Sequence, residues 1–376
     1  MVEKCMRLEE KLQNKLFSRR DFTLISTMLK GSLSKEEAIC LTENMDIDTE
    51  SSLYMLSMSI VGFRSGWEQF PDWVVPRVKG LHRYYQVSSG AGVPWLKARL
   101  VMLSEAGIPY ILTGGTAMRA FYASDVPRLN YGYDITVHTK DYEKAVILLR
   151  DGIKKSSSDP SDRTVNGYTK IMMHKGVPDA GLFSEDLFWE RACTVGFLEQ
   201  NVLVPCPEDM LLQLLCIPFG AQLIRELNDE RNRRLYEAGF VLKKGPVDYK
   251  LLADKARACG LESQARFFLS ILNKNASRAF PKDEWASFFC SDKDYISFLK
   301  NMLHLEEILN ICSRKPKSSY LQSLRQIRAE QKVVFPVRKA RRMKTGLLAY
   351  TIETRNIRHF SDVFRKKRAE RMKNYE

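Results

Sequence analysis

The chain has 376 residues, of which 44% are hydrophobic and 10% aromatic. A chain of this length and composition can bury a sizeable core, so wholesale disorder is excluded and two or three domains are expected. The longest apolar runs, such as MLLQLLCIPF at 210–219, are shorter than the roughly 20 residues that a membrane-spanning helix needs. The first residues, MVEKCMRLEEKLQNKLF, are charged throughout, and the eight cysteines form no CxxC pair. We therefore expect a reduced, cytoplasmic protein without a secretory signal.

The net charge of +14 is concentrated at the C-terminal end of the chain. Residues 313–376 contain 19 Lys and Arg but only five Asp and Glu, whereas residues 1–312 hold 40 of each kind. The basic residues form three clusters, RKPK, RKARRMK and FRKKRAERMK. A solvated basic helix, or a helical layer packed on the rest of the protein, would account for part of this charge. The near absence of acidic residues favours binding of a polyanion, RNA before DNA or a membrane.

In chain order, residues 1–105 are expected to form a helical N-terminal region. Ser34 and Glu37 have the spacing of a capping box at the start of a helix. Two further helices are expected in residues 70–107, on either side of a Ser- and Gly-rich break at 88–92. Gly107 is placed to end the second of them.

Residues 106–183 change to a compact α/β pattern. Short β-rich runs alternate with a turn and helix-like segments, which predicts one small mixed sheet with helices packed on one face. The expected strands are IPYILT, YDITVH, YTKIMMH and GVPDAGLF, and the expected helices are GGTAMRAFYA and KDYEKAVILLRDG, the second closed by Gly152. The fold class is therefore α+β, with helical regions on both sides of the sheet.

Residues 184–312 return to helical patterns, and we expect a second helical domain there. Ser184 is a candidate N-cap for the helix EDLFWERA, and Pro207 is placed to begin a long apolar helix, PEDMLLQLLCIPFGAQLIREL, with a possible disturbance at Pro218. Residues 313–376 are assigned to a separate basic C-terminal extension.

The stretch ILTGG, followed by YDITV, raises a chemical question. A glycine pair after a strand lets backbone N–H groups approach a phosphate, but glycine pairs are also ordinary turn formers. Asp134 lies among Tyr133, Ile135 and Val137 on a predicted strand, where aspartate is depleted, which favours a role in a site.

The ordered motifs of the chain resemble an uncharacterised bacterial nucleotidyltransferase family of the DNA polymerase beta superfamily. The motifs that carry the resemblance are GIPYILTGG, Arg128, YDITV, LLRDG, VPDAG, LFWERA and PEDMLLQLL, in that order. The resemblance covers roughly residues 60–275. It implies a nucleotidyltransferase-like palm in which carboxylates on neighbouring strands hold Mg²⁺ against the phosphates of an NTP.

The resemblance also assigns site residues. Asp134 and Asp179 are the expected catalytic and metal-binding carboxylates. Gly114, Gly115, Thr116 and Arg119 are the expected nucleotide-binding residues, with Lys170 as a second candidate for the rim of the cleft. Arg119 is equally compatible with a surface position. His138 and His174 show no metal-binding spacing and are interpreted as structural.

The chain departs from the family at the metal-binding strand, which should read Asp-x-Asp. If the chain is aligned with this motif by counting from Arg128 and Val137, Gly132 stands at the first aspartate and Asp134 at the second. In the alternative alignment Asp134 stands at the first aspartate and Thr136 at the second. One carboxylate is absent either way.

Two hypotheses follow. In the first, the protein transfers a nucleotidyl or phosphoryl group from an NTP, with weakened catalysis, and Asp125, Asp141 or Glu143 fills the gap in the metal site. In the second, it is a pseudoenzyme that binds RNA, a peptide or a partner enzyme.

Overall fold

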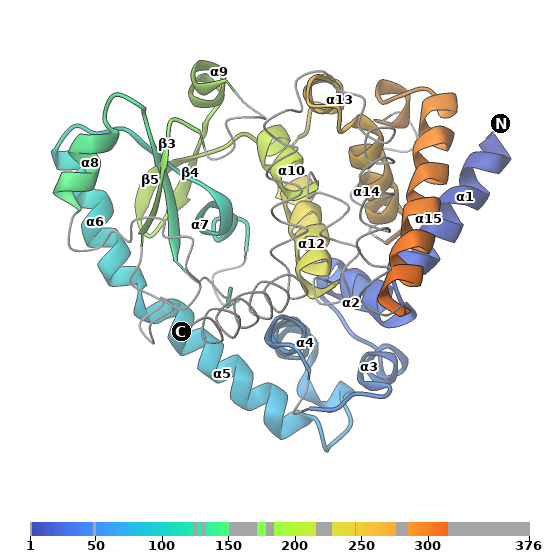
Figure 1. The fold of residues 1–376 in the computed structure, drawn as a ribbon. Helices are drawn as coiled ribbons and strands as arrows, with labels where there is room; N and C mark the ends of the chain where they lie inside the picture. Colours follow the sequence, from blue (N-terminus) through green and yellow to red (C-terminus); the bar gives the residue numbers. More distant parts are fainter. Residues whose placement is uncertain are drawn as a thin grey trace, which may run out of the picture.

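The fold consists of a small sheet at one end of the molecule and a larger helical region beside it (Figure 1). The computed structural model describes residues 2–47, 50–122, 127–128, 132–149, 171–177, 184–215, 228–244, 246–275 and 285–314. Several expected features lie outside these residues: Asp125, Gly152, Lys170, Asp179, Pro218, most of the expected strand at 176–183, and the basic extension from residue 315 onward.

The first hundred residues are helical, as expected. Ser34 caps α3 and forms the predicted capping box with Glu37, and Gly107 follows the end of α6 with a left-handed φ of 66°. The Ser- and Gly-rich segment does not interrupt α5, which continues to Ala91, so the break is confined to Gly92. The elements are α1 (Val2–Leu16), α2 (Arg19–Lys30), α3 (Lys35–Thr42), α4 (Ser52–Ser65), η1 (Trp67–Gln69), α5 (Val75–Ala91) and α6 (Val93–Glu105).

A five-stranded mixed sheet follows, in the order β3-β2-β1-β5-β4. β1 pairs antiparallel with β2 and parallel with β5, while β2 pairs parallel with β3. The predicted strands IPYILT and YDITVH therefore lie side by side in one sheet, which confirms the α+β fold class. The elements are β1 (Tyr110–Leu112), α7 (Gly114–Met118), β2 (Tyr133–Val137), α8 (Tyr142–Leu148) and β3 (Ile171–Lys175).

Helices lie against both faces of this sheet, not on one face as expected. Side chains alternate along β2, so Tyr133 and Asp134 point to opposite sides. The Tyr133 ring stacks on Trp95 of α6, with 6.2 Å between ring centroids. The Asp134 carboxylate lies against Gly115 of α7. Figure 1 shows α6 and α8 on one side and α7 on the other, toward α10 and α12.

Residues 184–215 contain a β-hairpin between two helices, where only helices were expected. Ser184 caps α9 (Glu185–Glu190) as predicted. β4 (Cys193–Phe197) and β5 (Gln200–Val204) then form an antiparallel pair, and β5 joins the sheet beside β1. The sheet is therefore built partly from residues assigned to the second helical domain. α10 (Pro207–Leu215) begins at the predicted proline.

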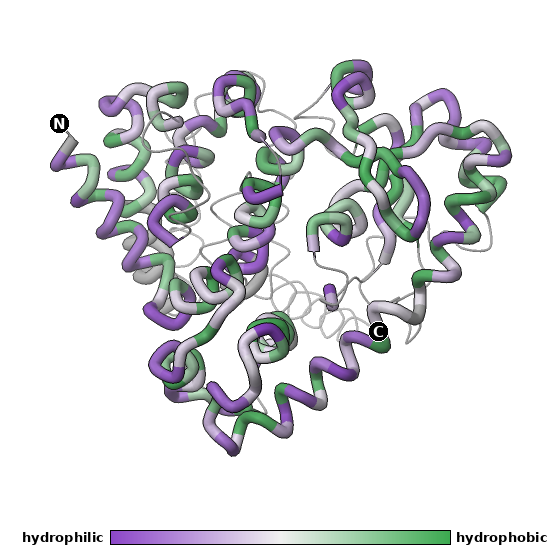
Figure 2. The backbone as a smooth tube through the Cα atoms, turned by 180° about the vertical axis from the view of Figure 1, so that it is seen from behind, coloured by the Kyte–Doolittle hydropathy of each residue, from purple (hydrophilic) through white to green (hydrophobic). Residues whose placement is uncertain are grey.

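The remaining described residues form helices that pack with α1 and α2 into one hydrophobic core (Figure 2). None of the helices in the described part of the chain combines the length and the apolar character needed to cross a membrane. The elements are α12 (Asn228–Lys244), α13 (Tyr249–Ala258), α14 (Glu262–Asn275), η5 (Trp285–Phe288) and α15 (Asp292–Arg314).

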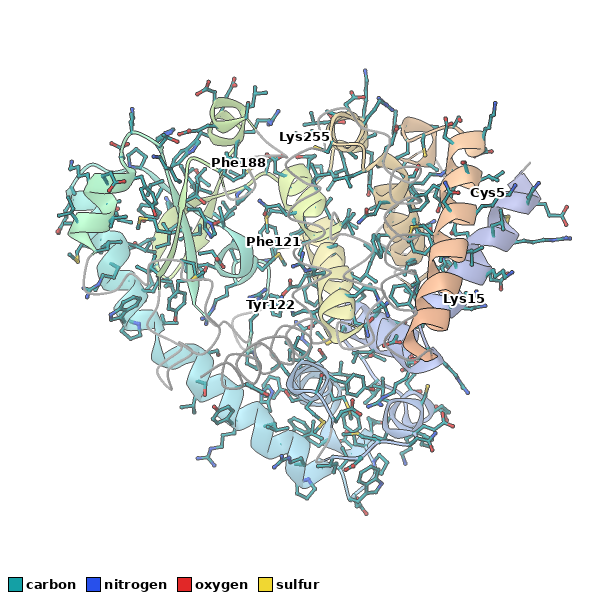
Figure 3. The ribbon with its side chains drawn as sticks, in the orientation of Figure 1. Cys5, Lys15, Phe121, Tyr122, Phe188 and Lys255 are labelled. Carbon is teal, nitrogen blue, oxygen red and sulfur yellow. The ribbon has the colours of Figure 1, made fainter. Side chains whose placement is uncertain are left out.

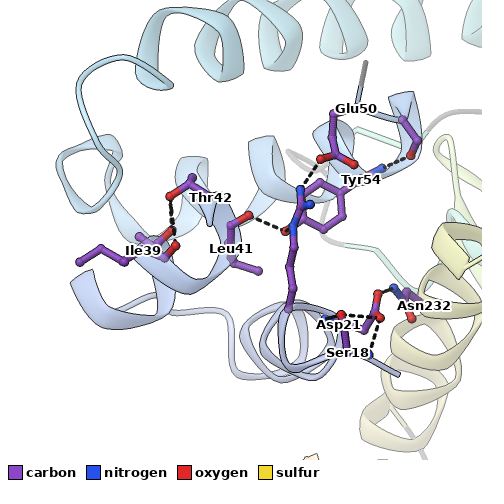
Figure 4. Close-up of polar contacts among 11 residues, drawn as sticks. Ser18, Asp21, Ile39, Leu41, Thr42, Glu50, Tyr54 and Asn232 are labelled. Carbon is purple, nitrogen blue, oxygen red and sulfur yellow. Dashed lines mark hydrogen bonds and ion pairs between the residues drawn. The ribbon is translucent and has the colours of Figure 1, made fainter. Parts of the chain in front are cut away.

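Polar side chains connect α2 to its neighbours (Figure 4). Ser18 caps α2 and shares a capping box with Asp21. Asp21 in turn accepts a hydrogen bond from the Asn232 amide of α12, so the start of α2 is fixed to a helix 211 positions away. The buried Tyr54 hydroxyl donates to the Leu41 carbonyl oxygen at 2.9 Å, which joins α4 to α3.

A buried ion pair connects the sheet region to the helical region. The Arg128 Nε donates to Glu237 Oε1 at 2.8 Å, and the Tyr122 hydroxyl donates to the same oxygen at 2.9 Å (Figure 3 labels Tyr122 near α12). The two charged side chains are 5% and 1% exposed. Burial alone would raise the pKa of Glu237, but the Arg128 and Arg233 guanidiniums and the hydrogen bonds lower it below its usual value. Arg128, one of the motif residues, is therefore a structural anchor.

We predict that Glu237→Gln destabilises the protein by about 3–5 kcal/mol, because it leaves the Arg128 guanidinium buried without its counterion. Denaturant unfolding of the purified variant measures this loss. Glu199→Gln is the matched control: it removes an ion pair with Lys97 at which Glu199 is 86% exposed, and it should change stability by no more than about 1 kcal/mol. Equal effects of the two substitutions would contradict the structural role of Glu237.

The same ion pair predicts the pH dependence of stability. The pKa of Glu237 is lower in the folded protein than its ordinary value of 4.5, so its stabilising contribution is present above that value and is lost as pH falls through the folded pKa. Melting temperature should therefore fall more steeply with acidification in the wild type than in Glu237→Gln. Parallel curves for the two proteins would show that Glu237 does not titrate in this way.

Candidate functional site

The turn after β1 and the start of β2 are held together by two hydrogen bonds. The Thr113 N–H donates to the Asp134 carbonyl oxygen at 3.0 Å, which extends the β1–β2 register by one residue. The Asp134 N–H donates to the side-chain Oγ1 of Thr116 at 2.7 Å, which keeps Asp134 directly beside the glycine turn. Thr116 is buried, so its hydroxyl positions the strand.

The Asp134 carboxylate is oriented by one contact at each oxygen. Oδ2 accepts a hydrogen bond from the Gly115 N–H at 3.3 Å. Oδ1 lies 3.2 Å from Nε2 of His174, on the neighbouring strand β3. The side chains of Asp134 and His174 are 28% and 30% exposed, so the pair is open to solvent on one side.

Glycine is required at position 114 because Asp134 approaches it so closely. Gly114 has a φ of 50°, and a Cβ atom there would lie 2.9 Å from Asp134 Oδ2. An L side chain would be strained by the backbone conformation and would also push the carboxylate away. Gly114 therefore has a structural reason, which is to admit this carboxylate against the turn.

The described residues do not provide the donor set of a two-metal magnesium site. No group of three or more His, Cys, Asp and Glu side chains that could hold a metal lies within the described ranges. Asp134 is the carboxylate at the turn, with the His174 imidazole beside it. Thr136, two residues along the strand, is fully buried and its hydroxyl lies 3.1 Å from that of Thr113.

The acids proposed to fill the gap do not lie beside Asp134 where the structure describes them. Asp141 and Glu143 follow β2, at the end of the strand away from the glycine turn. Neither contributes to a metal-binding group among the described residues. Asp125 and Asp179 lie outside those residues, so their roles remain predictions.

Arg119 has a structural partner on each side. Its Nη1 donates to the Ser89 carbonyl oxygen at 2.9 Å, near the end of α5. It also forms a side-chain hydrogen bond with Tyr133, and burial lowers the pKa of its guanidinium. Arg119 therefore connects α5 to β2, and contact with a phosphate would require it to leave these partners.

His138 belongs to a separate cluster at the other end of β2. Its ring stacks on Trp189 of α9 with centroids 3.6 Å apart, and its Nδ1 lies 3.2 Å from Glu185 Oε1. Both Glu185 oxygens accept hydrogen bonds from Thr139, at 2.8 Å from its N–H and 2.6 Å from its hydroxyl. The Trp189 indole N–H donates to the Gly176 carbonyl oxygen. This half-buried cluster docks α9 on the sheet and fits the structural interpretation of His138.

Comparison with known proteins bears on the same region. Residues 96–276 match the model of a family described as uncharacterised nucleotidyltransferase. This segment is nucleotidyltransferase-like. It begins within α6 and ends just after α14, so it includes the whole five-stranded sheet and the helices α10, α12, α13 and α14. No curated protein and no solved structure matches the chain.

The contact between His174 and Asp134 does not follow from the sequence, because His174 has no metal-binding spacing along the chain. The parallel pairing of β2 with β3 sets Thr136 opposite His174, which brings the imidazole diagonally beside Asp134. The helix α8 between two strand-like segments was the available signal, because such a crossover predicts parallel neighbours.

We predict that Gly114→Ala destabilises the protein more than Gly107→Ala does. Both glycines have positive φ, so each alanine carries the cost of a left-handed backbone, about 1–2 kcal/mol. A Cβ at Gly107 has nothing within 4 Å, whereas one at Gly114 overlaps Asp134. In an Asp134→Ala background the two costs should become equal. The measurement is a double-mutant cycle by chemical denaturation; additive effects at 114 and 134 would contradict the close contact.

Proposed function

We propose that the nucleotidyltransferase-like domain binds a nucleoside triphosphate at the Gly114–Gly115 turn, and that transfer of a nucleotidyl or phosphoryl group from it is weak or absent. The observation that supports this proposal concerns the described residues: there Asp134 is the carboxylate at the turn, and the side chain beside it is the His174 imidazole. Binding depends on the turn and the fold around it, whereas transfer depends on a complete carboxylate set.

The family likeness implies Mg²⁺, and the described residues do not fit a two-metal magnesium site. Mg²⁺ prefers octahedral oxygen ligands, and here one imidazole nitrogen stands beside one carboxylate. No catalytic step through Mg²⁺ is therefore assigned to these side chains. What they do provide is an oriented, partly exposed negative charge at the end of a glycine turn.

The burial of Thr136 supports the register in which Gly132 replaces the missing carboxylate. A carboxylate at position 136 would be enclosed beside Thr113, in a position with 0% exposure. Gly132 is partly buried and lies directly before β2, two residues from Asp134, so a carboxylate there would be less enclosed than one at position 136. The lost acid thus belongs, on this proposal, to position 132.

The test compares binding and transfer in the same preparations. We expect calorimetry to detect NTP binding to the wild type and a radiolabel assay to detect weak or no transfer. Robust transfer that Asp134→Ala abolishes would overturn the weak-transfer proposal, and the absence of NTP binding would overturn the binding proposal. Asp141→Ala is the matched control, since Asp141 lies at the other end of β2; it should leave binding unchanged.

Restoring the carboxylate provides a second prediction. Gly132→Asp should raise transfer at least tenfold, about 1.4 kcal/mol of barrier, because it returns an acid to a partly exposed position two residues before Asp134. Thr136→Asp should instead lower the free energy of unfolding by a few kcal/mol, because it buries a carboxylate without a partner. Transfer gained by Thr136→Asp and not by Gly132→Asp would favour the other register.

For the basic extension we propose binding of a polyanion, with RNA preferred. The support is its excess of 14 positive charges, which equals the net charge of the whole chain. Truncation after Cys312 should abolish RNA binding in a filter assay and leave NTP binding intact. Affinity of the full chain should fall by about 0.7 log unit per log unit of salt for each single-stranded phosphate neutralised. A truncated protein that still binds RNA, or one that melts at a much lower temperature, would contradict a separate binding extension.

A further inference from the structure

We propose that the outer face of α5 is a docking surface for an anionic lipid bilayer, which the helix contacts along its length. α5 runs along the outer edge of the molecule (Figure 1). The docking face consists of Trp73, which lies just before the helix, and of Arg77, Gly80, Tyr84 and Val87, all of them exposed. It is separate from the glycine turn, so the inference does not depend on nucleotide binding.

The periodicity of the helix determines which side of α5 is exposed. Val74, Val78, His82 and Tyr85 follow one another at spacings of four, four and three residues, and none of them is more than 6% exposed. Residues three or four positions apart share one side of a helix, so these four residues define the buried side of α5. The residues of the docking face recur at the same spacings on the opposite side.

Large apolar side chains are exposed on the docking face. Trp73, Tyr84 and Val87 are 53%, 57% and 67% exposed. The Tyr84 ring is held edge-on against the buried Tyr85 ring, with 5.4 Å between their centroids. Exposed apolar side chains that gather on one face mark a protein or membrane contact. Trp and Tyr are the residues enriched where a bilayer meets water, which favours the membrane.

The charge around the docking face favours an anionic occupant. Arg77, Lys79 and Arg83 are exposed. Residues 73–104 contain five Lys and Arg but no Asp or Glu, with Asp72 just before them. Basic side chains beside a line of apolar ones are typical of helices that lie in the interface of an anionic membrane. Long basic side chains can reach lipid phosphates while their stems stay along the apolar surface.

Gly80 lies at the centre of the docking face. Glycine is unfavourable in the middle of a helix, and a Cβ atom added at Gly80 would have nothing within 4 Å. Among the described residues, packing therefore gives no reason for glycine at this position. Its effect is to lower the surface between Arg77 and Tyr84, so that a flat partner can approach the whole helix.

Two other occupants fit this face less well. A second copy of the chain would bring Arg77 against Arg77 in a parallel packing of α5, or against Arg83 in an antiparallel packing about Gly80, and the like charges would repel. A single nucleic-acid strand stacks successive bases on aromatic rings. Trp73 and Tyr84 are eleven residues apart, about 16 Å along a helix, which suits side chains that enter a bilayer better than stacked bases.

The first experiment measures co-sedimentation of the full-length protein with vesicles of phosphatidylcholine alone or mixed with phosphatidylserine. We expect binding to the anionic vesicles only. Gly80→Glu should lower this affinity at least tenfold, because it sets a carboxylate against anionic lipid. Glutamate is also a better helix former than glycine, so the variant should melt no lower than the wild type. The double variant Arg77→Gln and Arg83→Gln should also lose at least tenfold.

Ile147→Glu is the matched control. It introduces the same charge at a position on α8 that is 72% exposed and lies away from α5 (Figure 1). It should leave vesicle binding unchanged. An equal loss in Ile147→Glu and Gly80→Glu would show that only the net charge of the protein matters, and would refute the docking face.

A second measurement separates docking by α5 from attraction of the basic extension to the same vesicles. Lipids with brominated acyl chains quench the fluorescence of tryptophans that enter the bilayer. The chain has five tryptophans, so the contribution of Trp73 is the quenching that is lost in Trp73→Phe. We expect this variant to remain bound and to lose most of the quenching.

Three further results would each refute the proposal. The first is an absence of binding to the anionic vesicles. The second is binding with the same quenching in the wild type and in Trp73→Phe, which would assign the contact to another part of the chain. The third is a Gly80→Glu variant that binds vesicles normally and loses affinity for single-stranded RNA, which would make the docking face a nucleic-acid site.

Discussion

The approach of the Asp134 carboxylate to the turn after β1 is the constraint on which the site depends. It requires glycine at position 114, occupies the Gly115 N–H, and turns one carboxylate oxygen toward β3. A negative charge at this position repels a triphosphate unless a cation lies between them. Binding of a triphosphate at this turn, as proposed above, therefore needs a positive charge close to Asp134 that offsets this repulsion.

A second interaction keeps this geometry fixed relative to the helices. Arg128 lies just before β2, and its buried pair with Glu237 joins that segment to α12. A buried ion pair contributes little net stability, but it is costly to break, because either charge is then left in an apolar interior. The pair therefore selects one arrangement of the sheet against α12. Arg128, which is one of the motif residues of the family resemblance, thus helps to fix the position of the strand.

Much of the fold could be predicted because local chemistry and packing agree. Side-chain preferences that act within a few residues account for the helix caps at Ser34 and Ser184, for the end of α6 before Gly107 and for the start of α10 at Pro207. They also account for the strands β1 and β2 on either side of the glycine turn. The site was predictable only in part. Asp134 and the glycine turn are close in the sequence, whereas the contact with His174 depends on the register between β2 and β3, which is fixed by tertiary packing.

The β4–β5 hairpin was not predicted, because its turn carries no local sequence signal. Its two-residue turn is Leu198-Glu199, and both residues adopt left-handed backbone, with φ of 54° and 62°. Turns of this kind usually contain Asn and Gly, which carry a small penalty there, so a Leu-Glu turn gives no local signal. The cost is offset by burial: Phe197, Val202 and Val204 enter the core, and β5 completes the sheet beside β1. A conformation that is unfavourable locally is thus imposed by the sheet, and the strand it creates supports β1, from which the glycine turn and the candidate site begin.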